Sequence, residues 1–246
     1  MQFNENEFPY ETLQQFGLTR EMIEDLPVHI INDIGEGRRS PVLPIKVNDE
    51  EGNIVKSRAR IAFVRTEGNA VDVIFFPEVL EADLSKFNEQ EKASLEAGKA
   101  IIASVEDKDG NMVKSFVQID KGTNQVLSAP VQVIGKNLQL ISVEIHLNAT
   151  ELSSIQNGEV VTFVHDDQDP ISVGIDLNEK TGLRFTPGDE KQWRDKREWD
   201  KYTFGAFGCW VQDDEGNLDY VNEEDYTDEL WNEQKKHSMK PMQHGR

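Results

Sequence analysis

The residues best suited to bind an anion gather in one stretch of the chain, between Gly37 and Arg65. This stretch contains seven Lys and Arg and three Asp and Glu, a local balance of +4. Arginine binds phosphate and carboxylate groups through two parallel hydrogen bonds, and lysine binds them as a point charge. The stretch therefore predicts a surface for DNA or another anionic partner, with these candidate residues: Arg38, Arg39, Lys56, Arg58, Arg60 and Arg65.

Three of these cations alternate along one expected strand. Lys56, Arg58 and Arg60 should share a face, because successive side chains of a strand point to opposite sides. Cations spaced roughly 6 to 7 Å apart can follow a phosphate backbone. Arg38 and Arg39, in a loop that follows a glycine, are expected to add an anion clamp. Two interpretations stay open: the cations bind a partner, or they pair with the chain's own carboxylates or simply face water on an exposed sheet.

The rest of the chain is acidic. Its 246 residues include 26 Lys and Arg and 46 Asp and Glu, a formal net charge of −20. Phosphate backbones and acidic membranes repel such a surface, which excludes generic nucleic-acid binding outside the cationic stretch and predicts no membrane partner. A dense carboxylate surface can also imitate the phosphates of DNA. The second hypothesis is therefore an acidic DNA mimic that inhibits a DNA-binding enzyme. The simplest alternative is that the acidic residues only keep the protein soluble.

Histidine spacing gives no support for a metal site. The five histidines form no pair at the spacing of zinc ligands. His165 stands beside three carboxylates, but it lies in an expected hairpin turn and is interpreted as part of a solvated turn. We expect no metal and no cofactor.

No catalytic motif surrounds the single cysteine. Cys209 has no cationic neighbour and is predicted to be a buried thiol. Gly205 and Gly208 lack the strand and helix context of a nucleotide loop, and are expected at bulge or close-packing positions. An active site would have to combine distant residues, such as Cys209 with His146, or His165 with Asp176. The chain is therefore expected not to be an enzyme.

A recurring pattern predicts two similar units in the middle of the chain. Asn88 is followed three residues later by a Glu, and the same spacing recurs at Asn148. This pattern is typical of a capping box at the start of a helix. Gly98 and Gly158 are expected to end the two helices, and each is followed by two β-rich runs with a polar turn between them. We therefore expect two tandem repeats, each a helix plus a β-hairpin.

Hairpin turns are marked by another shared pattern. Asp49, Asp107 and Asp213 each begin the spacing Asp-x-acid-Gly-Asn-apolar between β-rich runs. Glycine and asparagine adopt the positive φ of tight turns. A calcium loop is the alternative, but its glycine would be misplaced and no Glu closes a twelve-residue loop. We predict hairpin turns at all three places.

The expected fold is α+β. An amino-terminal αβ domain should hold a helix capped by Thr19 and strands at 42–47, 54–64 and 71–76. The carboxyl-terminal part should be a small, aromatic, β-rich cap with a polar tail from about Glu233. The expected boundaries of the four parts are 1–82, 83–135, 136–190 and 191–246.

A cytoplasmic location is expected from three observations. One cysteine cannot form an internal disulfide, which favours a reducing compartment. The first residues lack the positive and apolar regions of a signal peptide. No stretch approaches the roughly 18 apolar residues of a membrane span.

The chain resembles a known domain family in two places. The amino-terminal motifs resemble a domain of an uncharacterised family encoded on conjugative and integrative elements of Bacteroidetes; they are Phe8-Pro9-Tyr10-Glu11, Phe16-Gly17-Leu18-Thr19-Arg20-Glu21, Leu26-Pro27 and Gly37-Arg38-Arg39-Ser40-Pro41. The repeated pattern is similar to a second domain of unknown function that often accompanies it, through Leu95-Glu96-Ala97-Gly98-Lys99 and Val117-Gln118-Ile119-Asp120.

The resemblance implies an accessory role. Such domains are sometimes attached to DNA-processing proteins such as type IA topoisomerases, and no catalytic residue is established for them. The expectation is a non-enzymatic interaction module of a mobile genetic element, which docks a DNA-processing protein or DNA through residues 37–65. The oligomeric state is left open.

Overall fold

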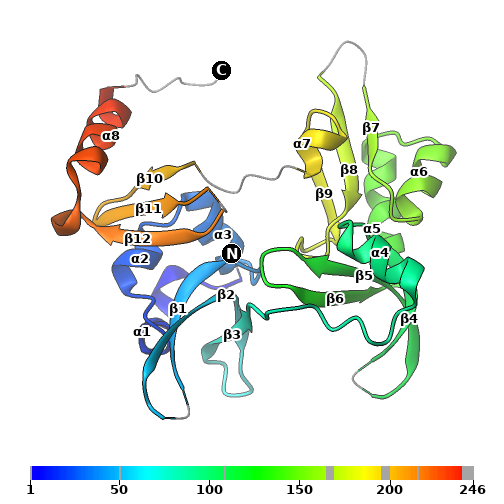
Figure 1. Ribbon diagram of the computed structural model, residues 1–246. Coiled ribbons are helices and arrows are strands. Elements are labelled where there is room, and N and C mark those ends of the chain that lie inside the picture. The colour runs from blue at the N-terminus through cyan, green and yellow to red at the C-terminus, as the bar shows by residue number, and fades with distance from the viewer. Residues whose placement is uncertain are drawn as a thin grey trace. The chain divides into compact units, whose positions relative to one another are not determined.

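The computed structural model describes residues 2–49, 51–107, 109–164, 169–194, 200–214 and 216–239. These residues form helices and four three-stranded antiparallel sheets, which confirms the expected α+β class (Figure 1). Within them, no helix is both long enough and apolar enough to cross a membrane. The chain divides into two compact units, Met1–Pro77 with Arg197–Arg246, and Glu78–Lys196.

The first unit begins with short helices and one sheet. The Thr19 hydroxyl accepts a hydrogen bond from the backbone N–H of Met22 at 3.3 Å, so the predicted cap is present. The three predicted strands are also present. The elements are η1 (Glu5–Glu7), α1 (Tyr10–Gln15), α2 (Arg20–Glu24), α3 (Val28–Gly35), β1 (Leu43–Asn48), β2 (Ile54–Arg65) and β3 (Val71–Pro77).

A second sheet and a helix complete this unit. They are β10 (Tyr202–Phe204), β11 (Gly208–Gln212), β12 (Leu218–Asn222), η2 (Glu223–Asp225) and α8 (Asp228–Met239). The hairpin expected around Gly216 joins β11 to β12. The polar tail expected from Glu233 is helical through Met239 instead, because Leu230 packs the helix against Cys209 and Tyr226.

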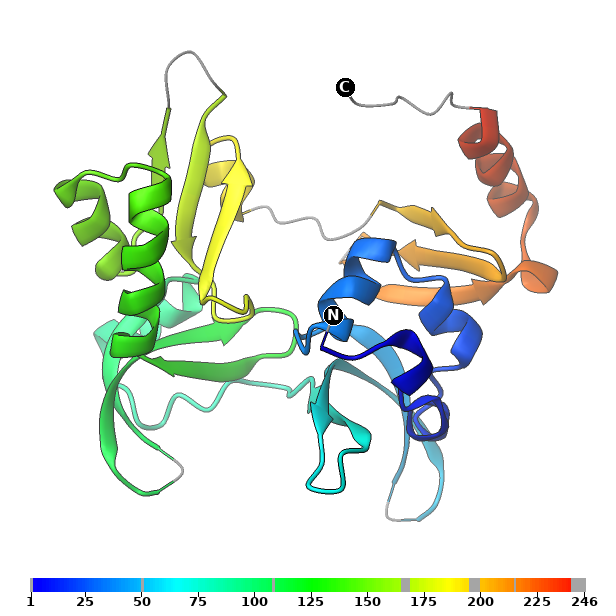
Figure 2. The same ribbon diagram turned by 180° about the vertical axis from the view of Figure 1, so that it is seen from behind.

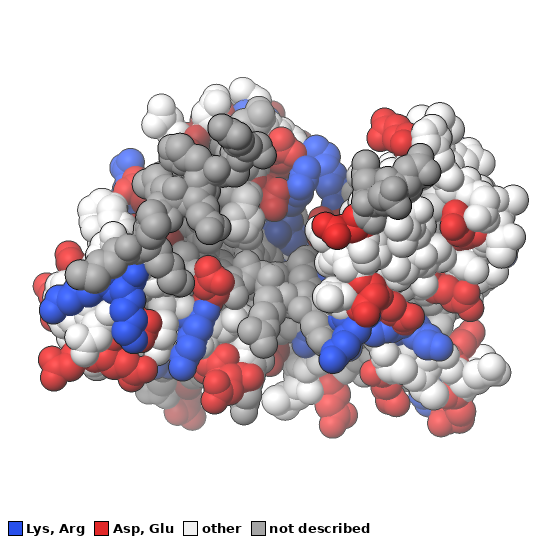
Figure 3. All heavy atoms as spheres, turned by 90° about the horizontal axis from the view of Figure 1, so that it is seen from above, with Lys and Arg blue, Asp and Glu red and all other residues white. Residues whose placement is uncertain are grey.

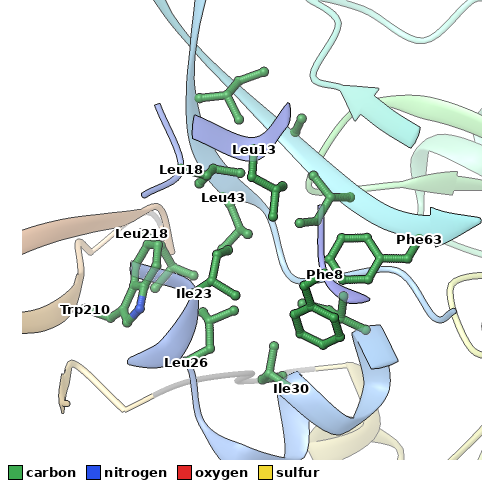
Figure 4. Packing of buried hydrophobic residues seen from close by; sticks show 14 of the residues in the cluster. Phe8, Leu13, Leu18, Ile23, Leu26, Ile30, Leu43, Phe63, Trp210 and Leu218 are labelled. Atoms are coloured by element: carbon green, nitrogen blue, oxygen red, sulfur yellow. The ribbon is translucent and has the colours of Figure 1, made fainter. Parts of the chain in front are cut away.

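The core of the first unit lies between the helices and one face of the β1–β2–β3 sheet (Figure 4). Alternate residues of β2, including Ile61 and Phe63, point into it, and α1 to α3 contribute leucines and isoleucines. Trp210 and Leu218, from the carboxyl-terminal sheet, belong to the same buried cluster. Segments far apart in sequence therefore share one core, so the carboxyl-terminal sheet is not a separate cap.

The second unit contains two helix-and-sheet segments. Both predicted capping boxes are present, at Asn88 with Glu91 and at Asn148 with Glu151. The elements of the first segment are α4 (Glu89–Glu96), β4 (Ile101–Glu106), β5 (Met112–Asp120) and β6 (Gln125–Pro130), and those of the second are α6 (Ala149–Gln156), β7 (Val161–Phe163), β8 (Ile171–Ile175), β9 (Leu183–Pro187) and α7 (Glu190–Arg194).

Each segment has three strands where a two-stranded hairpin was predicted. β6 and β9 were missed, as was α5 (Val131–Glu144), which joins the segments and spans the boundary expected after residue 135. The two segments share one core, which includes Phe116, Leu138 and Val173. Their equivalence as repeats of one unit stays a prediction.

Candidate partner-binding surface

The β1–β2–β3 sheet carries cations on the face opposite the core. Lys56, Arg58 and Arg60 alternate with the core residues of β2, so they share this face as predicted. The strand register places Lys46 of β1 directly opposite Lys56. It also places Phe76 of β3 directly opposite Arg60.

Two of these cations are held by the chain's own backbone. Arg60 is 8% exposed, and its Nη1 donates to the Ser40 carbonyl oxygen at 3.0 Å. Arg58 Nη1 donates to the Leu218 carbonyl oxygen at 2.8 Å, and Nη2 lies 3.9 Å from a carboxylate oxygen of Asp219. Both guanidinium groups therefore contribute to the internal structure of the unit.

Two further arginines form ion pairs at the surface. Arg38 contacts Asp33 at 2.8 Å and Glu36 at 3.1 Å. Arg65 contacts Glu7 at 3.0 Å. A partly exposed pair of this kind contributes about 0 to 1 kcal/mol to stability, and a competing anion can exchange with it at low cost. Both arginines thus pair with the chain's own carboxylates, as one of the two interpretations of the sequence expected.

Arg39 stacks on an aromatic ring. Its guanidinium carbon lies 4.0 Å from the ring centroid of Phe76. No aromatic residue alternates with Lys56, Arg58 and Arg60 in the sequence, because Phe76 comes from the next strand of the sheet. The signal that could have found it is the β2–β3 register, which places this ring beside Arg60. An arginine stacked on a ring offers a planar cation to a phosphate or a base.

Lys46 and Lys56 face each other across β1 and β2. Both side chains are exposed, and neither forms an ion pair with another residue that the structure describes. Like charges in directly opposite positions destabilise a strand pair. Ile54 and Val55, next to Lys56, are also exposed. This end of the hairpin therefore combines two lysines that pair with no described residue, exposed apolar side chains and the acidic turn that begins at Asp49.

The wider surface is acidic. On the face shown in Figure 3, Asp and Glu side chains (red) are scattered, and Lys and Arg side chains (blue) form small separate groups among them. This agrees with the formal net charge of −20.

Asp25 holds a loop of the carboxyl-terminal sheet. Its carboxylate is 5% exposed and accepts backbone N–H hydrogen bonds from Ala206 at 2.6 Å, Phe207 at 3.0 Å and Gly208 at 2.7 Å. A Cβ at Gly205 would overlap this carboxylate. The close-packing interpretation of the two glycines is therefore confirmed. The site is structural, because protein donors occupy the carboxylate oxygens.

Cys209 is fully buried, as predicted. Burial raises the pKa of its thiol to about 11, so the thiol stays protonated at neutral pH and is a poor nucleophile. Its suggested partner His146 belongs to the second unit. The other suggested pair includes His165, which lies outside the described residues. The structure thus provides no activated cysteine among the residues it describes.

In each of the three hairpin turns, the aspartate side chain accepts hydrogen bonds from backbone N–H groups of the same turn. Asp49 Oδ1 accepts backbone N–H hydrogen bonds from Glu51 at 2.9 Å and Asn53 at 2.8 Å. Asp107 and Asp213 make the corresponding bond to the asparagine of their turn. The turn prediction is confirmed at all three places. In the described parts of the chain, no group of three or more His, Cys, Asp or Glu could hold a metal ion.

Comparison with known proteins matches the part of the chain that holds the cationic stretch to a domain family. The fold and surface described above define an α+β protein with a cationic sheet face in its first unit. Residues 3–79 match the family model described as "Protein of unknown function (DUF4099)". This confirms the amino-terminal resemblance at the level of a domain family. No curated protein and no solved structure matches the chain.

Proposed function

We propose that this chain is a non-enzymatic interaction module that docks DNA, or a DNA-processing protein, through the cationic segment 37–65. The observation that carries the proposal is the Lys46–Lys56 pair. Two lysines stand opposite each other without an ion pair to any described residue, although the chain contains 46 Asp and Glu. The mobile genetic element that we propose as its setting rests on the resemblance of the amino-terminal motifs.

An anionic partner would relieve the repulsion within this pair. Directly opposite residues of a sheet have Cβ atoms about 4.5 to 5.5 Å apart, so both ammonium groups can reach one phosphate or two neighbouring phosphates. Arg39, in the loop before β1, adds a planar cation that is stacked on Phe76 of the same sheet. The exposed Ile54 adds apolar contact. This combination suits a flexible single strand better than a smooth duplex, because stacking requires open bases.

Binding is tested by fluorescence anisotropy with labelled single-stranded and duplex DNA at low salt. The Lys46→Ala/Lys56→Ala variant should bind single-stranded DNA at least about tenfold more weakly. The association constant should also depend less on salt, with the negative slope of log K against log salt smaller in magnitude by about 1 to 2. Lys99→Ala/Lys114→Ala is the matched control. Both of these lysines are exposed residues of the second unit, and their loss changes the net charge equally.

The control separates a specific surface from general charge. Equal losses in the two double variants would contradict a role for the Lys46–Lys56 pair. Absence of DNA binding by the wild-type chain would overturn the DNA form of the proposal. That result would favour the acidic DNA mimic, which predicts salt-sensitive binding to a DNA-binding enzyme such as a nuclease or a methyltransferase.

A further inference from the structure

Helix α5 has an apolar outer face as well as a buried inner face. Ile134 and Leu138 point into the core of the second unit. On the outer side, Val133 is 51% exposed, Leu140 72% and Val143 74%. Figure 2 shows α5 (green) at the front of its unit, with no other element of that unit drawn across it. A stripe of three aliphatic side chains is therefore open on one helix.

The only charged residues of α5 lie on this same face. They are Lys136 and Glu144, which stand four residues before and four residues after Leu140. At about 100° per residue, these charges and the three aliphatic side chains fall within one arc of about 100°. Both charged side chains are exposed, and neither forms an ion pair with another described residue.

We propose that this face of α5 binds the same face of a second copy of the chain, as an antiparallel helix pair with Leu140 on the two-fold axis. A two-fold axis at Leu140 places Lys136 opposite Glu144 of the partner subunit, and the reverse pair forms by symmetry. A parallel pair would place like charges together. The charge pattern of α5 is thus complementary to itself in one orientation alone.

The contact predicts a weak, concentration-dependent dimer. One helix face buries less than the roughly 800 Å² per partner that is typical of a stable complex. The expected dissociation constant is therefore on the order of 1 to 100 µM. Burial of the aliphatic stripe favours association through the hydrophobic effect, and the two symmetric ion pairs set the orientation of the helices.

Sedimentation velocity of the full chain, from about 1 to about 300 µM, tests the dimer. The wild type should shift from monomer to dimer within this range. Leu140→Glu should remain monomeric, because it places like charges on the axis without removing a core residue. Leu80→Glu is the matched control, since Leu80 is an exposed leucine outside α5. A monomeric wild type, or equal effects of the two variants, would overturn the proposal.

A charge exchange tests the orientation. Lys136→Glu and Glu144→Lys should each weaken self-association at least about fivefold, because each variant pairs like charges across the axis. An equimolar mixture of the two single variants should restore association, since both contacts in the mixed dimer join opposite charges. Failure of the mixture to associate would contradict the antiparallel pair, even if the chain dimerises.

Discussion

The hydroxyl of Tyr220 donates a hydrogen bond to Asp25 Oδ2 at 2.5 Å, across 195 positions of sequence. Asp25 ends helix α2, and Tyr220 lies in β12. Burial and the nearby Asp25 carboxylate raise the pKa of the tyrosine hydroxyl, which keeps it a donor. Because the family match ends at residue 79, this bond joins the matched domain to a sheet outside the match.

Removing the Asp25 carboxylate should destabilise the first unit strongly. Asp25→Ala leaves three backbone N–H groups and the Tyr220 hydroxyl without their acceptor, at an expected cost of about 3 kcal/mol in the free energy of unfolding. Tyr220→Phe removes one donor and should cost about 1 kcal/mol. Urea unfolding followed by tryptophan fluorescence measures both. A smaller effect for Asp25→Ala than for Tyr220→Phe would contradict the central role of the carboxylate.

Alanine in place of Gly205 should lower the free energy of unfolding, whereas alanine in place of Gly135 should not. A Cβ at Gly205 would overlap Asp25, so Gly205→Ala is expected to lower the free energy of unfolding by about 1 to 3 kcal/mol. Gly135 lies within α5, and no atom stands within 4 Å of the position a Cβ would take. Gly135→Ala should raise stability by about 0.5 to 1 kcal/mol, because alanine loses less entropy in a helix. Thermal unfolding of both variants measures this contrast.

The two capping asparagines, Asn88 and Asn148, should make similar contributions to the free energy of unfolding. Asn88 and Asn148 each accept backbone N–H hydrogen bonds from the first turn of their helix, at 2.9 to 3.0 Å. Substitution of either by alanine should cost about 1 kcal/mol, and substitution by serine should cost much less, because serine also caps. Urea unfolding followed by circular dichroism gives the values. Equal effects of alanine and serine would show that the cap hydrogen bonds are not the cause.

The buried thiol predicts a loss of stability at alkaline pH. The folded state raises the pKa of Cys209 from 9.0 to about 11, so the folded protein holds this proton more tightly than the unfolded chain does. The raised pKa of this thiol therefore contributes to the free energy of unfolding. That contribution is fully present below pH 9 and is lost as the pH rises from 9 to about 11. Between these values, the free energy of unfolding should fall more steeply in the wild type than in Cys209→Ala. Parallel slopes would contradict this.

The same burial predicts an unreactive thiol in the folded protein. Alkylating reagents attack the thiolate, which is scarce below about pH 9 at a buried cysteine with a raised pKa. Iodoacetamide at neutral pH should therefore label Cys209 only after denaturation, as mass spectrometry of the intact chain would show. Rapid labelling of the folded chain would contradict the position of Cys209 in the core.

The correct structural predictions from sequence concern local hydrogen bonds. The Thr19 cap and the Asp49 turn each join residues no more than four positions apart, so neighbouring residue types are enough to predict them. Helix α5 was missed because it contains Gly135 and several β-branched residues, which have low helix propensity. It is helical because Ile134 and Leu138 are buried against both sheets of the unit, and tertiary packing outweighs propensity.

The sequence by itself determined which residue types are present and how they alternate: a cationic stretch at 37–65 and Lys56, Arg58 and Arg60 on one face of a strand. Only the tertiary structure decided how each cation is used. Arg58 and Arg60 donate to backbone carbonyls of Leu218 and Ser40, and no local pattern predicts such contacts. The pairing of Lys46 with Lys56, in contrast, follows from the local turn at Asp49, because the turn of a hairpin fixes the register of its two strands.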